Sequence, residues 1–411
     1  MRKIVVFIVA LCVPVIFFAI PAGAVVPPPP NDNFPGTTVA QLPYTDATTS
    51  NVAATTETGE PGTPSCTDAT GATEWYSFTP AQDIAVAADT IQSNFDTVLV
   101  VYTGQALGSL TEIACNDDSG PDFGSWSRVG LTLHGGTTYY FQVGGWFDPA
   151  ANPQDPSANP STGNVVFHLT QRTPRAGVVR GNVWHLRGPG GGEADSFAFG
   201  RPGDVPLPGT WKGDGISKPA LRRGNTWAVN NWFDGSTEFT VPFGRATDFP
   251  LVGDWDGDTF ASPGVRRGNV WYVTNTVTGL TESFSYGRPT DYPIVGDWNG
   301  DGIDTPGVIR GNVWYLNNGF DGSADIVFAY GRSTDFPVVG DWNGDGIATP
   351  GVVRGNTWYL NNGFDGTADQ TFTFGRSTDF PIAGDWDGAG VLFPASAAGV
   401  RPASAKAHVS R

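Results

Sequence analysis

Five copies of a short aromatic-Gly-Arg motif follow one another in the second half of the chain, and this repetition restricts the fold more than any other feature. Successive copies begin 44, 43, 44 and 44 residues apart, at Phe199, Phe243, Tyr286, Tyr330 and Phe374. Self-similarity at such a period indicates a repeat architecture with one structural unit per copy.

Two tryptophan positions recur in step with this motif. Their ten members are Trp184, Trp211, Trp227, Trp255, Trp271, Trp298, Trp314, Trp342, Trp358 and Trp386. We expect these side chains to fill the small core of each unit, because every unit needs its own large apolar groups. Stacking of the tryptophans on sugars is the alternative.

Each copy holds four short segments typical of strands, separated by Asn-Gly and Asp-Gly turns. In the third copy they span 292–298, 307–310, 313–317 and 326–330. A unit of this size with four strands matches a propeller blade. The array starts with a segment, 177–180, that corresponds to the second strand of a unit. The last copy supplies a segment of the first-strand type, 380–386, which is placed to complete that initial unit. We therefore predict a β-propeller of about five four-stranded blades, with an incomplete ring or an open array as alternatives.

The segment before the repeats, 31–171, reads as short strands bounded by turn residues, with no sustained helical periodicity. The predicted strands span 74–78, 84–88, 97–102, 129–133, 138–143 and 165–169. Seven or eight short strands in a segment of this length are typical of a β-sandwich. The predicted fold class is therefore all-β throughout.

Two families share motifs with the chain. PNDNF at 30–34, EWYSF at 74–78, FDTVLVVYTG at 95–104 and ACNDD at 114–118 resemble bacterial pre-peptidase C-terminal domains. The resemblance implies a jelly-roll-like sandwich that serves as a non-catalytic accessory module. The repeats, with DFPVVGDWNGDG at 335–346, resemble FG-GAP and VCBS-type propeller blades, which implies extracellular recognition or adhesion without a fixed ligand.

The N-terminus has the pattern of a secretory signal peptide, with a basic head, an apolar run and small residues at the cleavage position. An uncleaved membrane anchor is the alternative. The predicted organisation is a signal peptide at 1–24, a Pro-rich spacer at 25–30, the sandwich at 31–171, a linker at 172–175, the repeats at 176–394 and a flexible tail at 395–411. We expect a secreted protein that does not insert into a membrane after cleavage.

Cleavage removes Cys12 and leaves Cys66 and Cys115, an even pair in an exported chain. A disulfide between them is the expected state in an oxidising compartment. A catalytic or metal-binding pair is the alternative, although neither cysteine has a neighbouring histidine.

The chain of 411 residues has a formal net charge of −17, with 23 Lys+Arg against 40 Asp+Glu. An acidic surface repels phosphate backbones, so we expect no nucleic-acid partner. The same acidity suits hard cations.

Three of the five copies place oxygen-bearing side chains at alternate positions of one turn, the spacing by which an EF-hand-like loop wraps calcium. The candidate ligands are Asp254, Asp256, Asp258 and Ser262 in the second copy, Asp297, Asn299, Asp301, Ile303 (through its carbonyl) and Thr305 in the third, and Asp341, Asn343, Asp345, Ile347 and Thr349 in the fourth.

The first and last copies depart from this pattern. Lys212 is expected to put an ammonium where the ion belongs in the first copy, and Ala389 removes a ligand from the last. We predict weak Ca²⁺ sites in the three intact turns. The alternative is that these sequences only form hairpin turns.

Catalysis has little support in the sequence. The four histidines have no zinc-type spacing, and no nucleophile elbow or His-Glu-x-x-His helix occurs. We therefore predict a secreted, non-enzymatic recognition or adhesion protein that binds an unidentified extracellular glycan or protein. The alternatives are a propeller enzyme acting on polysaccharide, a glycosidase or a lyase, and a purely structural surface component.

Overall fold

The computed structural model describes residues 26–118, 125–147, 160–188, 191–231, 233–275 and 278–386. The predicted signal peptide and C-terminal tail lie outside these residues. The described chain is all-β, as predicted, apart from two 3₁₀ turns, Asn51–Ala53 and Leu107–Ser109. None of its helices has the length and apolar composition needed to cross a membrane.

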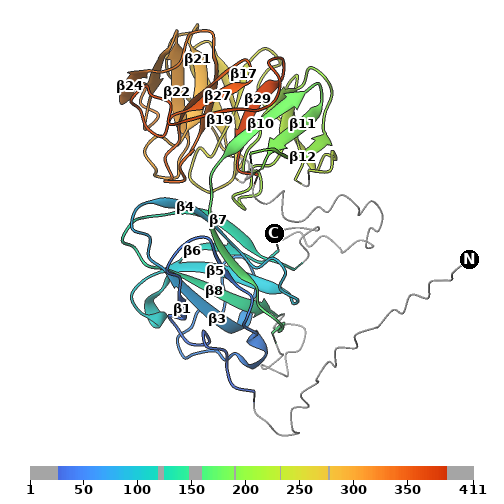
Figure 1. Ribbon diagram of the computed structural model, residues 1–411, viewed down its shortest axis with the longest axis vertical. Coiled ribbons are helices and arrows are strands. Elements are labelled where there is room, and N and C mark those ends of the chain that lie inside the picture. Colours follow the sequence, from blue (N-terminus) through green and yellow to red (C-terminus); the bar gives the residue numbers. More distant parts are fainter. Residues whose placement is uncertain are drawn as a thin grey trace, which may run out of the picture.

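The N-terminal half consists of two sheets packed face to face (Figure 1). One has the order β1 (Thr37–Thr38), β3 (Thr70–Phe78), β8 (Tyr139–Trp146), β5 (Thr97–Thr103), β6 (Thr111–Asn116), and the other β2 (Tyr44–Asp46), β9 (Phe167–Gln171), β4 (Ile84–Asp89), β7 (Arg128–Leu133). Both sheets contribute fully buried side chains to one core. Tyr76 of β3, for example, stacks on Phe167 of β9 with ring centroids 4.1 Å apart.

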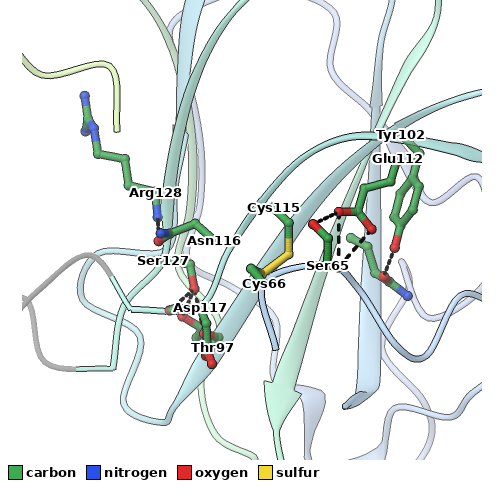
Figure 2. The surroundings of a disulfide bond; sticks show 11 residues. Ser65, Cys66, Thr97, Tyr102, Glu112, Cys115, Asn116, Asp117, Ser127 and Arg128 are labelled. Atoms are coloured by element: carbon green, nitrogen blue, oxygen red, sulfur yellow. Dashed lines mark hydrogen bonds between the residues drawn. A yellow bond between two sulfur atoms is a disulfide. The ribbon is translucent and has the colours of Figure 1, made fainter. Parts of the chain in front are cut away.

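The predicted disulfide is present. Cys115 of β6 is bonded to Cys66, which lies before β3, with a Cα–Cα distance of 5.6 Å (Figure 2). The bond ties the edge of the larger sheet to the loop that enters it.

The repeats form five four-stranded antiparallel sheets. In spatial order they are β12 (Glu193–Ala198), β11 (Val183–Arg187), β10 (Arg175–Arg180), β29 (Phe380–Gly384); β13 (Val205–Pro206), β14 (Ala220–Arg223), β15 (Thr226–Val229), β16 (Phe239–Pro242); β17 (Phe249–Gly253), β18 (Ser262–Arg267), β19 (Val270–Thr274), β20 (Thr281–Ser285); β21 (Tyr292–Gly296), β22 (Thr305–Arg310), β23 (Val313–Leu316), β24 (Ile326–Ala329); and β25 (Phe336–Gly340), β26 (Thr349–Arg354), β27 (Thr357–Leu360), β28 (Gln370–Thr373). Each sheet follows the chain order except the first.

The first sheet joins the two ends of the repeat array. β29 pairs with β10 in a register that places Arg175 opposite Gly384 and Val179 opposite Phe380, and Figure 1 shows the two strands side by side. This is the pairing predicted from the phase of the repeats.

All ten repeat tryptophans are buried, at 0 to 6% exposed. Their indole N–H groups bond to backbone carbonyls in nine of the ten, as when Trp314 Nε1 donates to Tyr330 O over 3.2 Å. They therefore fill the sheet cores, as expected, and present no exposed ring face to a sugar.

A bidentate Arg–Asp pair fixes the start of the first strand in every sheet. In the sheet of β21, β22, β23 and β24, Arg310 Nε and Nη2 donate to Asp291 over 2.9 and 2.7 Å. The five pairs are Arg180–Asp379, Arg223–Asp204, Arg267–Asp248, Arg310–Asp291 and Arg354–Asp335. The aromatic-Gly-Arg arginine contributes only its backbone N–H to this carboxylate.

The two halves meet where β4 and the linker approach the turns that follow the first strands of the repeats (Figure 1). Ala85 of β4 donates its N–H to Gly344 O over 3.0 Å, and Gln171 Nε2 donates to Asn343 O over 2.8 Å. Arg172 forms an ion pair with Asp385, Nε to Oδ2 2.7 Å. The acidic turns of the repeats therefore lie on the face that meets the sandwich.

Candidate functional site

The acidic turns connect the first and second strands of their sheets, and the first aspartate of each organises the turn. Asp297 Oδ1 and Oδ2 accept the N–H groups of Gly300 and Gly302 over 2.7 and 2.8 Å. Asp341 accepts the equivalent N–H groups of Gly344 and Gly346 over the same two distances. These bonds hold the carboxylate inside its own turn.

The third and fifth positions of the turn bond to each other. Asn299 Nδ2 donates to Asp301 Oδ2, and Asn343 Nδ2 to Asp345 Oδ2, each over 2.8 Å. The second carboxylate oxygen of Asp301 accepts the N–H of Ile303 over 2.9 Å. Ile347 donates to Asp345 in the same way. The third and fourth copies thus have the same local structure.

The second copy brings three carboxylates together. One oxygen each of Asp254, Asp256 and Asp258 lie within 4.8 Å of one another. Asn275 Nδ2 donates to both Asp256 and Asp258, the latter over 3.0 Å. Thr259 adopts a left-handed φ of 71° at the position where the other copies have glycine, a conformation that is costly for a β-branched residue.

The ninth-position residues Ser262, Thr305 and Thr349 are 2, 2 and 1% exposed and begin the second strand of each sheet. The Thr305 hydroxyl donates to Gly296 O over 3.4 Å, and the Thr349 hydroxyl to Gly340 O over 3.2 Å. The hydroxyl hydrogens of Thr305 and Thr349 therefore point to the first strand of their sheets.

Burial raises the pKa of the first aspartate in these turns. It raises the pKa of Asp341 to about 6. The pKa of Asp254 rises to about 7, through burial first and then through the nearby charges of Asp304 and Asp258. A cation placed among these oxygens would remove this penalty on the charged form.

Asp304 was not predicted as part of this site. It belongs to the third copy, yet its Oδ2 accepts the N–H of Asp254 over 2.9 Å, so the turns of adjacent copies are bonded to each other. Burial raises its pKa to about 7. The other four copies have Ser217, Ala261, Ala348 and Leu392 at this position, which is the only sequence signal that distinguishes Asp304.

In the first copy a second lysine also reaches the turn. Lys218, at the ninth position, places its Nζ 3.0 Å from Asp214 Oδ2, and Lys212 lies close enough to interact with the charge of Asp214. The side chains of Lys218 and Asp214 are 1 and 4% exposed. In the fifth copy, Asp385 at the first position is paired with Arg172 from the linker, and Ala389 lies outside the described residues.

The first and fifth turns are therefore each neutralised by a cation from the protein. Among the described residues, no such ion pair reaches the carboxylates of the three predicted calcium turns. A cavity of about 350 Å³ between the sandwich and the repeats is lined by Asp254, Asp297 and Asp301, with Thr132 of β7 and Arg172 opposite them. Two of the three predicted calcium turns thus line this cavity.

A second acidic cluster lies in the sandwich beside the disulfide and was not predicted. Single oxygens of Asp96, Asp117 and Asp118 lie within 4.8 Å of one another. Burial raises the pKa of Asp96 to about 6 and that of Asp117 to about 7. Figure 2 shows Asp117 next to Ser127, which donates to its backbone carbonyl. The sequence signal is the Cys-Asn-Asp-Asp run at 115–118.

Comparison with protein-family models gives no match, and comparison with curated proteins gives none. A solved structure of a protein of unknown function from Bacteroides caccae aligns at 11% identity and a TM-score of 0.30, over 49% of this chain and 73% of that chain. A lectin from Agrocybe aegerita, described as recognising non-reducing terminal N-acetylglucosamine, aligns at 11% identity and a TM-score of 0.30, over 50 and 78%. Likenesses this weak carry no argument here.

Proposed function

We propose that this chain is a secreted, non-enzymatic recognition or adhesion protein. Its repeats form a five-bladed β-propeller that serves as the binding platform, and its N-terminal half is a jelly-roll-like sandwich of the pre-peptidase C-terminal type. The platform binds an extracellular glycan or protein.

The observation that carries the proposal is a hollow common to all five sheets. One strand of each sheet, β13, β17, β21, β25 and β29, contributes to its lining. Strands of neighbouring sheets that meet around one axis, together with an end strand that completes the first sheet, are the features of a closed propeller. Closure leaves only short, protected strand edges and makes a rigid platform.

The same hollow weighs against the enzymatic alternative. Its described lining consists of proline, aliphatic and aromatic side chains, as in Pro250, Leu251 and Ile294. Hydrolysis of a glycosidic bond needs two carboxyl groups facing one bound sugar, and none of the described residues that line this hollow carries one. Turnover of cell-wall polysaccharides by the purified protein would overturn this part of the proposal. We expect binding to a glycan array or to whole cells without turnover.

We also propose that Ca²⁺ binds the three acidic turns. The donors are carboxylate and amide oxygens, which suit a hard cation, and the two remaining turns obtain their positive charge from Lys218 and Arg172. The turns lack the bidentate glutamate of an EF-hand, so the expected dissociation constant is on the order of 10⁻⁴–10⁻³ M, as in extracellular modules. Calcium would hold in place the turns of the repeats, which lie on the face that meets the sandwich.

Melting in EDTA and in millimolar calcium tests the metal proposal. We expect a higher midpoint in calcium, because a ligand that binds only the folded state stabilises it. An unchanged midpoint together with no heat of binding by calorimetry would refute it, while the recognition proposal would stand on its own test.

A further inference from the structure

The sheets of the repeats have one end at the sandwich and one end away from it. The first strand of each sheet runs from the loop with the aromatic-Gly-Arg motif to a turn on the side of the sandwich. The hairpin between the second and third strands lies at the same end as that loop. We call these loops and hairpins the distal face; they span 200–204, 244–248, 287–291, 331–335 and 375–379, and 180–183, 223–226, 267–270, 310–313 and 354–357.

The distal face is positively charged, although the chain has a formal net charge of −17. Its loops and hairpins contain ten arginines, five aspartates and no other charged residue. The aspartates are those of the five bidentate pairs. Their side chains are 0 to 8% exposed, whereas the paired arginine side chains are 33 to 49% exposed. The carboxylates therefore lie beneath the arginines, and five positive charges remain in excess.

The arginines of the aromatic-Gly-Arg motif supply this excess. Among the described residues, nothing accepts a hydrogen bond from their guanidinium groups, and only their backbone N–H groups reach the loop aspartates. Both oxygens of Asp335, for example, are already bonded to Arg354 over 2.8 and 2.7 Å. The six most exposed lysines and arginines in the described part of the chain all lie on the distal face: Arg201, Arg223, Arg245, Arg288, Arg332 and Arg376.

Aromatic side chains adjoin these arginines. The residue after each loop aspartate begins the first strand, and in four copies it is an aromatic residue that lines the axial hollow: Phe249, Tyr292, Phe336 and Phe380. Rings of neighbouring sheets touch, with centroids 5.4 Å apart for Phe249 and Tyr292 and 5.1 Å apart for Phe336 and Phe380. Three of the four, Phe249, Tyr292 and Phe380, are exposed. The distal face thus combines aromatic surface with unpaired guanidinium groups.

A pocket of about 390 Å³ brings the two kinds of side chain together. It lies between the sheet of β21 to β24 and the sheet of β25 to β28, and Tyr292, Phe336, Arg310 and Arg332 line it. Arg310 is held by Asp291 and by the ring of Tyr315, whose centroid is 4.6 Å from its guanidinium carbon. Arg332 has no such anchor and is free to bind a ligand.

This surface suits a ligand that carries both carboxylates and rings. The guanidinium fork matches a carboxylate with two hydrogen bonds, and an aromatic side chain packs on the apolar face of a sugar ring. The hydroxyls of Ser333 and Thr334, which line the same pocket, suit sugar hydroxyls. An acidic peptide offers carboxylates without such rings. A nucleic acid has a charge density that the acidic remainder of the chain repels.

We propose that the distal face binds an acidic polysaccharide, whose uronic acid units place their carboxylates on the arginines of the aromatic-Gly-Arg motif. The pocket beside Arg332 takes one unit. This inference rests on the proposed recognition function and names its ligand class. Because the loop recurs five times, one polysaccharide chain can contact several arginines at once, which strengthens binding beyond that of a single unit.

Calorimetric titration of the purified protein with alginate, a polymer of uronic acids, tests the distal face. Dextran is the uncharged comparison, polyglutamate is the acidic peptide and duplex DNA is the nucleic acid. We expect alginate to bind more tightly than the other three. Its binding should weaken as the salt concentration rises from about 0.05 to 0.5 M, because salt screens exposed charges.

Arg288→Gln and Arg332→Gln should each weaken alginate binding about three- to tenfold, the loss of one charge-assisted contact. Arg332→Lys should retain part of the affinity, since it keeps the charge without the fork. Ser323→Asp is the matched control: it changes the net charge by the same amount, but in the exposed turn between β23 and β24, at the end near the sandwich. We expect the control to bind alginate like the wild type. All four variants alter exposed side chains and should melt like the wild type.

Three results would overturn the inference: alginate binds no better than dextran, polyglutamate or DNA binds more tightly than alginate, or the two glutamine variants bind as well as Ser323→Asp. Whole-cell binding separates this failure from that of the proposed function. Cell binding that the Arg288→Gln/Arg332→Gln/Arg376→Gln variant fully retains would refute the distal face and leave recognition intact. Absence of cell binding by the wild type would count against recognition itself, while the alginate titration still decides on the distal face.

Discussion

Replacing Lys218 by methionine tests the internal cation of the first repeat turn. The Nζ of Lys218 lies 3.0 Å from Asp214 Oδ2, with 1 and 4% of the two side chains exposed. At this distance and an effective dielectric constant of about 20, the attraction is roughly 5 kcal/mol. Methionine fills similar space but leaves Asp214 as a buried charge without its partner.

Breaking a buried pair by removing one member typically costs about 3–5 kcal/mol, because the other charge stays buried. We expect a loss of this size in the free energy of unfolding. For a unit of the size of the repeat array it corresponds to a midpoint lower by roughly 6–20 °C. Asp214 also accepts the N–H of Ile216 over 3.0 Å, which softens the loss without cancelling it.

Urea denaturation followed by tryptophan fluorescence measures the effect. Arg245→Met is the control, since it removes one cation from an exposed position and should change stability by less than about 0.5 kcal/mol. Asp214→Asn/Lys218→Met should recover part of the loss, because no uncompensated charge remains. If Lys218→Met unfolds like Arg245→Met, the reasoning about the buried pair is wrong.

The remaining predictions concern acid, calcium and the disulfide. The hydrogen bond from Arg267 lowers the pKa of Asp248, so this pair stabilises the fold above the ordinary aspartate pKa of about 4 and is lost as the pH falls below it; Arg267→Gln should flatten that acid-side decline in melting midpoint. Asp301→Ala and Asp345→Ala should each remove part of any calcium-induced rise in melting midpoint. If calcium raises the midpoint of both variants as much as that of the wild type, these two turns are not calcium sites. Reduction of the disulfide should lower stability by roughly 2–4 kcal/mol for a loop of this length, and intact mass before and after reduction should differ by two hydrogens; free thiols in protein from the medium would contradict the bond.

The strand positions followed from the repeats because five copies in register define the same four segments. In the third copy the expected 292–298 and 307–310 compare with Tyr292–Gly296 and Thr305–Arg310. The prediction of the strands of the sandwich was less complete. Short β1 and β2 and the edge strand β6 were missed, because they lack the alternating apolar pattern that marks the longer strands.

Contacts between distant residues were the part that the sequence did not reveal. Four of the five Arg–Asp pairs join residues 19 positions apart, and the fifth, Arg180–Asp379, joins residues 199 positions apart. Asp304 reaches the turn of the copy before it, 50 residues away. Lys218 lies near the first turn as Lys212 does, and the sequence did not reveal that its ammonium is buried against Asp214.

Binding to whole cells is the most direct test of the central claim, that the repeat array is an extracellular recognition platform. The purified mature protein, with calcium present, is titrated onto candidate bacterial or host cells and detected by flow cytometry. We expect saturable binding that excess unlabelled protein competes away and that proceeds without degradation of surface polysaccharide. Binding that never saturates, or release of sugar fragments from the surface, would contradict it.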